Sequence, residues 1–322
     1  MDEIVFDKLS GSGNDFICID NRRGRYADLL ASPERIARLA RALCHRGTGV
    51  GADGVIFACE PQIRGVADVE ARFLEADGTE AELCGNGTAC FVRWFMRHLG
   101  EAASGDEDRQ IRILTPAGVV LGMDLAGRTA GPADHGEYVQ VCIPLPENIR
   151  RDLSVSVDGR RMICDYAEVG VPHLVTYVDD IDGFNMERLG PALRRHEMFA
   201  PRGVNANFVQ VLGRRRIAVR TFEFGVEGET LACGTGSAAA AILTALREGW
   251  GGEFPPPADP VEILSRGGDV LRVYFSLEEA EPEPRVTDVC LETVVRSVYG
   301  GVVHPDLAAY ALDGPVAESV PA

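Results

Sequence analysis

The feature that most constrains this chain is a short motif that occurs twice. Residues 84–89 (CGNGTA) and 233–238 (CGTGSA) both read C-G-x-G-[ST]-A, and each opens a helical pattern. The first pattern runs to Leu99 and the second to Glu248, and glycine follows each one, as is common where a helix ends. A chain with this motif must place a cysteine at the start of each of two helices.

Further similarities surround the two copies. Each follows an acidic segment that contains glycine, at 78–80 and at 228–230. A second echo lies upstream of each copy, where residues 15–17 (DFI) resemble residues 207–209 (NFV). Self-similarity of this kind predicts two related halves, each presenting one cysteine at a helix start.

The rest of the chain predicts a strand-rich α+β fold. Alternating apolar runs predict strands at 3–9, 16–20, 54–59, 111–115, 139–143, 208–212 and 217–222. A helix is predicted over 33–44, with Ser32 as its N-cap and one apolar face. Surface loops are expected at 101–108, 126–136 and 254–260, and we expect 303–322 to form a loose tail or one short helix without chemistry.

Charge and cysteine usage exclude several classes of function. A formal net charge of −17 opposes binding to nucleic acids and anionic membranes. The N-terminus carries acid where a secretory signal carries Lys or Arg, and the longest apolar stretch, around 238–246, is too short to span a bilayer. Nine cysteines spread over 322 residues do not suggest a disulfide framework. We therefore expect a cytoplasmic protein with no nucleic-acid or membrane partner.

Two cysteines at helix starts suit one particular reaction. A helix N-terminus favours a thiolate over a thiol and can bind a carboxylate, and flanking glycines let a ligand approach the backbone. Two such starts supply a base on one face of a bound molecule and an acid on the other. The sequence therefore predicts inversion at the α-carbon of a free amino acid by Cys84 and Cys233. No lysine stands in a recognisable pyridoxal phosphate site, so we expect no cofactor.

Other interpretations of the same motif stay open. A single cysteine is most often a buried structural residue, and glycine-rich turns also occur in phosphate and nucleotide loops, so a non-enzymatic phosphate- or nucleotide-binding protein is one alternative. A redox protein that cycles Cys84 and Cys233 between dithiol and disulfide is another. Zinc is disfavoured, because Cys84 and Cys90 are six residues apart and no Cys or His pair has zinc-ligand spacing. The repetition of the motif favours the catalytic interpretation.

These segments resemble the diaminopimelate epimerase family, whose members are cytosolic two-thiol enzymes without a cofactor. The matching motifs occur in the family's order through most of the chain, at 13–16 (GNDF), 49–54 (GVGADG), 76–78 (ADG), 84–87 (CGNG), 172–173 (PH), 204–206 (VNA), 229–230 (ET) and 233–236 (CGTG). The resemblance implies two pseudo-symmetric α+β domains, each a curved, mostly antiparallel sheet around a central helix. The first domain would span residues 1–126, with 295–322 returning to it, and the second would span 127–294. The resemblance also implies an active site in the cleft between the domains and a possible homodimer.

The resemblance also assigns roles to single residues. Cys84 and Cys233 would be the acid and base, with His173 and Glu223 orienting the substrate and the thiols. The backbone N–H groups of four residues would hold the α-carboxylate of a small amino-acid substrate, namely Gly85, Asn86, Gly234 and Thr235. Asn14 and Asn205 match asparagines that contact the substrate.

Three departures bear on which amino acid is bound. Glu75, Val171 and Phe224 stand where the family has Asn, Asn and Arg, which grip the distal amino and carboxylate groups of diaminopimelate. Without that Arg no obvious cation remains for a second carboxylate, and Glu75 would repel one. Diaminopimelate is the family default, but these residues favour a basic or aromatic side chain, as in histidine, lysine, ornithine or arginine.

Overall fold

The computed structural model describes residues 3–63, 65–81, 84–99, 110–129, 135–250, 259–278, 280 and 285–313. The chain divides into two compact units, which are described separately below. Unit 1 consists of residues 1–137 and 295–322, and unit 2 of residues 138–294. Residues 127–137, placed in the second half from the sequence, thus belong to unit 1. The strand over 118–129 continues past residue 126, where the sequence placed the boundary and the start of a loop.

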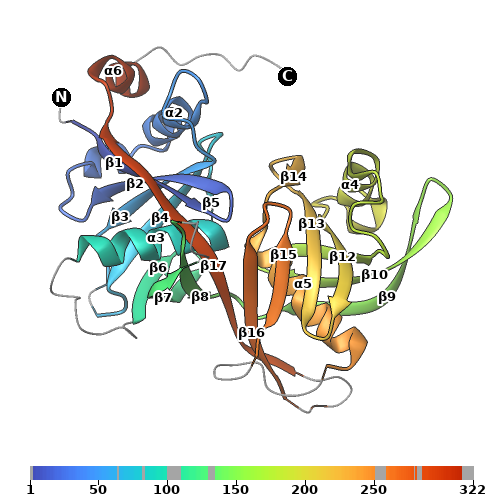
Figure 1. Ribbon diagram of the computed structural model, residues 1–322. Coiled ribbons are helices and arrows are strands. Elements are labelled where there is room, and N and C mark those ends of the chain that lie inside the picture. Colours follow the sequence, from blue (N-terminus) through green and yellow to red (C-terminus); the bar gives the residue numbers. More distant parts are fainter. Residues whose placement is uncertain are drawn as a thin grey trace. The chain divides into compact units, whose positions relative to one another are not determined.

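Within the described residues, unit 1 is a mainly antiparallel sheet with four helices (Figure 1). Its strands are β1 (Val5–Gly11), β2 (Asn14–Asn21), β3 (Gly54–Cys59), β4 (Val69–Glu75), β5 (Glu80–Ala81), β6 (Gln110–Thr115), β7 (Gly118–Thr129) and the last part of β17 (Arg285–Val302). Its helices are α1 (Ala27–Leu30), α2 (Pro33–Cys44), α3 (Gly85–His98) and α6 (Pro305–Asp313). The short C-terminal helix that the sequence allowed is α6.

Unit 2 is also a mainly antiparallel sheet. Its strands are β8 (Glu137–Cys142), β9 (Glu147–Val157), β10 (Arg160–Val169), β11 (Val171–Tyr177), β12 (Asn205–Gly213), β13 (Arg216–Glu223), β14 (Gly228–Thr230), β15 (Val261–Ser265), β16 (Val270–Glu278) and the first part of β17. Its helices are α4 (Met186–Arg194), a 3₁₀ turn at Glu197–Phe199 and α5 (Gly234–Glu248).

The two units repeat one pairing pattern. In unit 1, β1 pairs antiparallel with β2, β2 parallel with β3, β3 antiparallel with β4, β4 parallel with β6, and β6 antiparallel with β7. In unit 2 the same order of directions runs through β10, β11, β12, β13, β15 and β16. The short strands β5 and β14 precede α3 and α5 at matching points. The pseudo-symmetric α+β fold expected from the sequence is therefore present.

One of the two sequence echoes does not follow this symmetry. Residues 15–17 lie in β2, whose counterpart in unit 2 is β11, whereas residues 207–209 lie in β12, the counterpart of β3. The three-residue match between them is therefore coincidental, because a buried strand start tolerates few residue types. The glycine-flanked cysteines, by contrast, do occupy equivalent positions.

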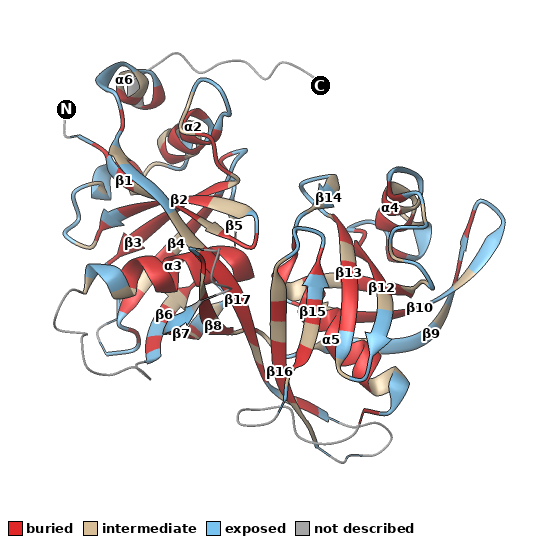
Figure 2. Cartoon of the chain, viewed as in Figure 1, coloured by how far each residue is buried: buried red, intermediate tan, exposed pale blue. Residues whose placement is uncertain are grey.

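Each unit is built around one buried helix. The first eleven residues of α3 are all buried, and α5 is buried from Gly236 to Ala245 (Figure 2). α3 lies against β1, β2, β3 and β7, and α5 lies against β10, β11, β12, β13, β15 and β16. Small residues such as the alanines at 238–241 let the sheet approach α5 closely. α5 ends at Gly249 in the left-handed conformation (φ 62°), as expected, whereas Gly100 lies outside the described residues.

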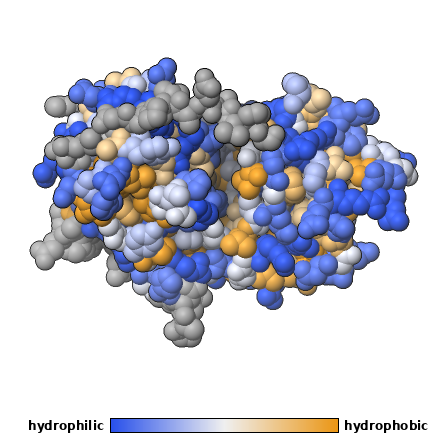
Figure 3. Space-filling view, turned by 90° about the horizontal axis from the view of Figure 1, so that it is seen from above, coloured by the Kyte–Doolittle hydropathy of each residue, from blue (hydrophilic) through white to orange (hydrophobic). Residues whose placement is uncertain are grey.

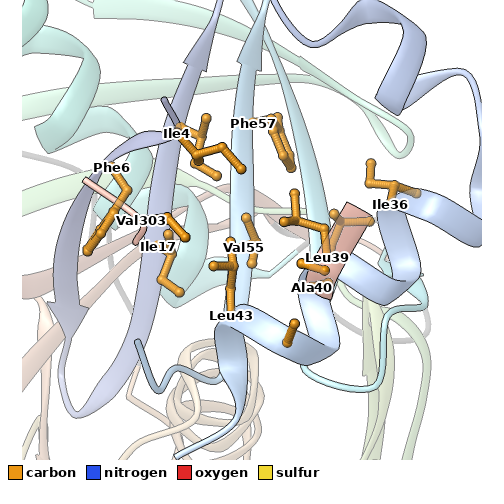
Figure 4. Packing of buried hydrophobic residues seen from close by; sticks show 14 of the residues in the cluster. Ile4, Phe6, Ile17, Ile36, Leu39, Ala40, Leu43, Val55, Phe57 and Val303 are labelled. Atoms are coloured by element: carbon orange, nitrogen blue, oxygen red, sulfur yellow. The ribbon is translucent and has the colours of Figure 1, made fainter. Parts of the chain in front are cut away.

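The helix α2 shows how the sequence pattern becomes packing. Ser32 caps it by accepting a hydrogen bond from the N–H of Arg35 at 3.4 Å. The predicted apolar face then packs on β3 in the core shown in Figure 4, with Leu39 and Leu43 almost fully buried against Val55. Burying each leucine contributes roughly 2 kcal/mol.

The face seen in Figure 3 is mainly hydrophilic, with small apolar areas scattered over it. Within the described ranges, no helix is both long and apolar enough to cross a membrane. Nor does that part of the chain contain a group of three or more His, Cys, Asp or Glu side chains placed to hold a metal ion.

Candidate active site

Cys84 stands directly before α3 and caps its first turn. Its backbone is extended (φ −132°, ψ 114°), and its Sγ accepts a hydrogen bond from the N–H of Gly87 at 3.4 Å. Glycine suits position 87, because a Cβ there would lie 3.3 Å from the Cβ of Cys84 and from the ring of Phe16. The half-buried sulfur thus lies at the positive end of the α3 dipole, where a thiolate is stabilised.

Cys233 has the same place and geometry at the start of α5. Its backbone is extended (φ −117°, ψ 115°), and its Sγ accepts from the N–H of Gly236 at 3.4 Å. A Cβ at position 236 would lie 2.4 Å from Oδ1 of Asn207 and 3.1 Å from the Cys233 sulfur. In both units one first-turn N–H donates to the sulfur, and the N–H groups of a helix start can bind a carboxylate.

A line of hydrogen bonds leads from Asn207 to the sulfur of Cys233. Nδ2 of Asn207 lies 3.1 and 3.2 Å from the carbonyls of Leu174 and Asn205, which can only accept. An amide nitrogen cannot accept, so Nδ1 of His173, at 3.3 Å, is the acceptor, and the two amide hydrogens are shared among these three atoms. Nε2 of His173 then carries the proton and donates to Oγ1 of Thr235 at 3.1 Å. The Thr235 hydroxyl is left to donate to Sγ of Cys233 at 3.7 Å.

His173 acts in this line as a neutral group. Its side chain is fully buried, and burial lowers the pKa of His173 to about 3. The imidazole therefore carries no charge near neutral pH and stabilises a thiolate through hydrogen bonding alone. A general acid role for His173 at neutral pH does not fit this environment.

Glu223 acts on Cys233 in the opposite direction. Burial, followed by the negative charge of Glu223, raises the pKa of Cys233 well above its ordinary value, while the hydrogen bonds from Gly236 and Thr235 lower it. Oε1 of Glu223 accepts from the hydroxyl of Thr230 at 2.5 Å. Without a ligand Cys233 is therefore a thiol, beside a carboxylate that can accept its proton.

In unit 1, Asn14 belongs to a charged cluster. Its Nδ2 donates to Oδ2 of Asp53 at 3.1 Å, and Arg46 bridges Asp53 and Asp15 at 2.8 and 2.6 Å. Burial raises the pKa of Asp15, but hydrogen bonds from Arg46 and Lys8 outweigh it and lower that pKa to about 2. Because Asp53 engages Nδ2, the amide oxygen of Asn14 faces away from this carboxylate.

A cavity of about 450 Å³ opens beside this cluster, within unit 1. It is lined by Lys8, Ser10, Gly13, Asp15, Arg46, Gly47, Val50, Gly51, Val298 and Tyr299. The volume suits a small molecule, and Asn14 lies between two of its lining residues in the sequence.

The positions that depart from the family pattern lie on both units. Oδ1 of Asn205 accepts from the N–H of Phe224 at 2.7 Å, which fixes the backbone below an exposed phenyl ring. The guanidinium of Arg194 lies 4.2 Å from the centre of that ring and pairs with Glu227 at 2.9 Å. α4 brings this cation to the ring, but its N–H groups already bond to Glu227 and to the carbonyl of Arg202, so Arg194 is not available to a second carboxylate.

Glu75 and Val171 complete this group. Glu75 ends β4 with an exposed side chain. Val171 is half-buried at the start of β11, two residues before His173. Glu75 thus presents an acidic group on unit 1, and Val171 an apolar one on unit 2.

The predicted site residues divide between the two units. Unit 1 holds Asn14, Glu75, Cys84, Gly85 and Asn86, whereas unit 2 holds Val171, His173, Asn205, Glu223, Phe224, Cys233, Gly234 and Thr235. Contacts within unit 2 join His173, Thr235 and Glu223 to Cys233, and Asn205 to Phe224.

Sequence reasoning missed Asn207, Arg194 and Arg46. The strand alternation offered one signal, because Asn205 and Asn207 are two residues apart in β12 and so share a face. No local pattern indicates Arg194 or Arg46, whose partners are distant in the sequence.

Known proteins match this chain along most of its length. The family model described as diaminopimelate epimerase matches residues 6–137 and 166–273. A diaminopimelate epimerase of Aquifex aeolicus is 36% identical over 307 residues, which cover 95% of this chain and 99% of that protein. One of Archaeoglobus fulgidus is 38% identical over 286 residues, covering 86% and 91%.

Solved structures share the fold at low sequence identity. A phenazine biosynthesis protein of the PhzF family from Bacillus anthracis matches with a TM-score of 0.68 at 16% identity, over 94% of this chain and 100% of that one. A probable proline racemase from Agrobacterium radiobacter matches with a TM-score of 0.66 at 16% identity, over 98% and 99%. The family model and the curated relatives together show that this chain belongs to the diaminopimelate epimerase family, a family of isomerases.

Proposed function

We propose that this protein inverts one α-carbon of diaminopimelate, without a cofactor, by a two-base mechanism. The observation that carries the proposal is the pair of cysteine-capped helix starts, which have the same hydrogen bond to sulfur at 3.4 Å in both units. The substrate comes from the relatives, which carry that name at 36–38% identity.

In the proposed reaction, the two starts lie on opposite faces of the substrate, in the cleft between the units. The thiolate of one cysteine takes the α-proton, and the thiol of the other gives a proton to the opposite face. The first-turn N–H groups at Gly85, Asn86, Gly234 and Thr235 hold the α-carboxylate, onto which negative charge spreads. One proton is removed and one added, so the two cysteines exchange protonation states in each turnover.

The surrounding residues take supporting roles in this proposal. Thr235 and His173 stabilise the Cys233 thiolate, and Glu223 accepts the proton that Cys233 must lose before it can act as the base. Asn14 and Asn205 contact the substrate. Water must be kept away from the carbanion, so the units close over the substrate during the reaction.

A second candidate substrate is an amino acid with a basic or aromatic side chain. Glu75 favours it, because an exposed carboxylate attracts an ammonium or imidazolium group and repels a second carboxylate. Phe224 adds an exposed ring, 46% accessible, for stacking. Arg194, beside that ring, does not offset this preference, because its guanidinium is buried and already paired with Glu227.

Proton exchange in D2O separates these candidates. We expect LL-diaminopimelate to lose its α-proton signal and yield the meso form at least ~10-fold faster than L-histidine, L-lysine, L-ornithine or L-arginine. Faster exchange of one of the other four would establish the second candidate. No exchange with any of them would overturn the proposal.

We further propose a cytoplasmic homodimer that forms through β1 and β17. Val5, Val298, Tyr299 and Val302 expose apolar side chains on these two paired strands. Light scattering after gel filtration should show a dimer that Val298→Asp converts to a monomer. Leu264→Asp, at an exposed apolar position in unit 2, should leave it dimeric. A monomeric unmodified protein would contradict this interface.

A further inference from the structure

A second cysteine pair lies away from the helix starts. Cys142 ends β8 and Cys290 lies in β17, and their sulfur atoms are 2.7 Å apart. The N–H of Ile143 donates to the carbonyl of Val289 at 3.1 Å, so the two strands are hydrogen-bonded beside the pair. On its other side, Cys290 pairs with Tyr274 of β16. Both strand segments are thus fixed in the sheet and hold the two thiols together.

The surroundings of this pair differ from those of the buried cysteines. Cys18, Cys90 and Cys164 are buried, and desolvation raises their pKa values. The hydrogen bond from Cys290 lowers the pKa of Cys142, although burial and the charge of Asp288 oppose this. Both thiols are also partly accessible to solvent. Cys142 is therefore the thiol on which a thiolate forms more readily, with an oxidation partner already in contact.

We propose that Cys142 and Cys290 form a reversible disulfide that acts as a redox-sensitive crosslink between β8 and β17. The oxidant is a low-molecular-weight disulfide such as oxidised glutathione. The Cys142 thiolate attacks one sulfur of the oxidant and releases one thiolate, which leaves a mixed disulfide on Cys142. Cys290 then loses its proton and attacks the Cys142 sulfur, releasing the second small thiol. The two protein thiols lose two electrons and two protons, and the oxidant becomes two thiols.

Little rearrangement is needed to close this bond. A disulfide has a sulfur separation of about 2.0 Å, so the atoms approach by less than about 1 Å. The hydrogen-bonded neighbours Ile143 and Val289 already hold the strands at pairing distance. The crosslink can therefore form without unfolding the sheet.

The position of the pair gives the bond a consequence. The chain passes from unit 1 to unit 2 at 137/138 and returns at 294/295, and these are its two covalent connections. β8 begins at the first connection and β17 contains the second, and Cys142 and Cys290 both lie in unit 2, within five residues of these connections. A bond between the two cysteines fixes the unit 2 ends of both connections to each other and so stiffens the two strands through which the units are joined. The oxidised protein should therefore turn over more slowly, an expectation that rests on the proposed function.

Peptide mapping tests the crosslink independently of activity. The full-length protein is equilibrated in glutathione buffers of increasing oxidation, its remaining thiols are alkylated, and it is digested with trypsin. The peptides 129–150 and 286–296 carry Cys142 and Cys290. We expect them as one disulfide-linked species that separates on reduction, and we expect Cys142→Ser and Cys290→Ser to carry glutathione on the remaining cysteine. Free thiols at both positions in the most oxidising buffer would overturn the proposal.

Activity measurements then test the consequence. Oxidation to the linked species should slow α-proton exchange at least ~3-fold, and reduction should restore it. Cys142→Ser and Cys290→Ser should keep full activity and lose this part of the oxidant response. Any response that they retain reports on Cys84 and Cys233. If α-proton exchange were unchanged in the linked protein, the proposed restraint of the units would be overturned. If oxidation produced the linked peptides but the reduced protein had no epimerase activity, only the proposed function would be refuted.

Discussion

We expect that replacing either Cys84 or Cys233 by alanine abolishes epimerisation, with kcat falling by at least about 10³-fold in each variant. Either change removes one of the two groups that must act on opposite faces of the α-carbon, and alanine can neither take nor give a proton in its place. The measurement is conversion of LL-diaminopimelate to the meso form, followed by chiral chromatography. Cys142→Ser is the matched control, since it removes a partly exposed thiol outside the proposed site and should leave activity unchanged.

The two alanine variants should remain folded. Each loses one sulfur hydrogen bond at a helix N-cap, which costs roughly 1 kcal/mol. Melting curves close to that of the unmodified protein would show that the lost activity reports on chemistry. A variant that kept epimerisation within about 10-fold of the unmodified protein would contradict a two-base mechanism and favour binding by the backbone alone.

The second large effect is expected from Asn207→Asp, a change that replaces one amide nitrogen by oxygen. A carboxylate cannot donate, so Nδ1 of His173 must carry the proton and Nε2 becomes an acceptor. The Thr235 hydroxyl then donates to Nε2 and no longer to the sulfur of Cys233. We expect kcat to fall by about 10²-fold, the loss usual for one hydrogen-bond donor to a developing or resident negative charge.

The pH profile distinguishes this reversal from a general loss of structure. In the unmodified protein the pKa of His173 is about 3, so His173 contributes no ionisation between pH 5 and 9. A buried carboxylate at position 207 favours the imidazolium and raises that pKa, so the variant should gain an ionisation in this range. If the pH profile of the variant showed no new ionisation, this would contradict the assignment of the proton to Nε2 of His173.

Two changes at Thr235 complete this test. Thr235→Val removes the last donor in the line without burying a charge, and should lower kcat to a similar extent with no new ionisation. Thr235→Ser keeps the hydroxyl and should retain most of the activity. Equal rates for valine and threonine would show that the line from Asn207 does not act on Cys233.

The parts of the fold that sequence predicted are those with local causes. The glycine-flanked cysteines open α3 and α5 because capping and close approach depend on a few adjacent residues. The helix over 33–44 has exactly its predicted bounds, since Ser32 and the apolar spacing define it locally. The strand over 285–302 was not predicted. It belongs first to the sheet of unit 2 and then to that of unit 1, so its apolar and polar residues do not alternate with one pattern along its length.

Site features with distant causes escaped prediction. Asn207 can bond to His173 only because β11 and β12 pair in parallel, which brings together two residues that are 34 positions apart in the sequence. Arg194 reaches Phe224 through the packing of α4, and Cys142 reaches Cys290 across 148 residues. The three-residue echo at 15–17 and 207–209 failed for a related reason, since so short a match carries no information about strand order.

The strand β17 has a consequence for how the protein is made. β1, the first of the described strands to be synthesised, pairs with residues 295–302 of β17, the last of them. On the ribosome, the sheet of unit 1 therefore lacks one strand beside β1 until unit 2 has been synthesised in full, and unit 2 has all its own strands first. An exposed β1 edge is open to wrong pairing during that interval. The half that is begun first is completed last, and a chain shortened before residue 295 would keep that edge unpaired.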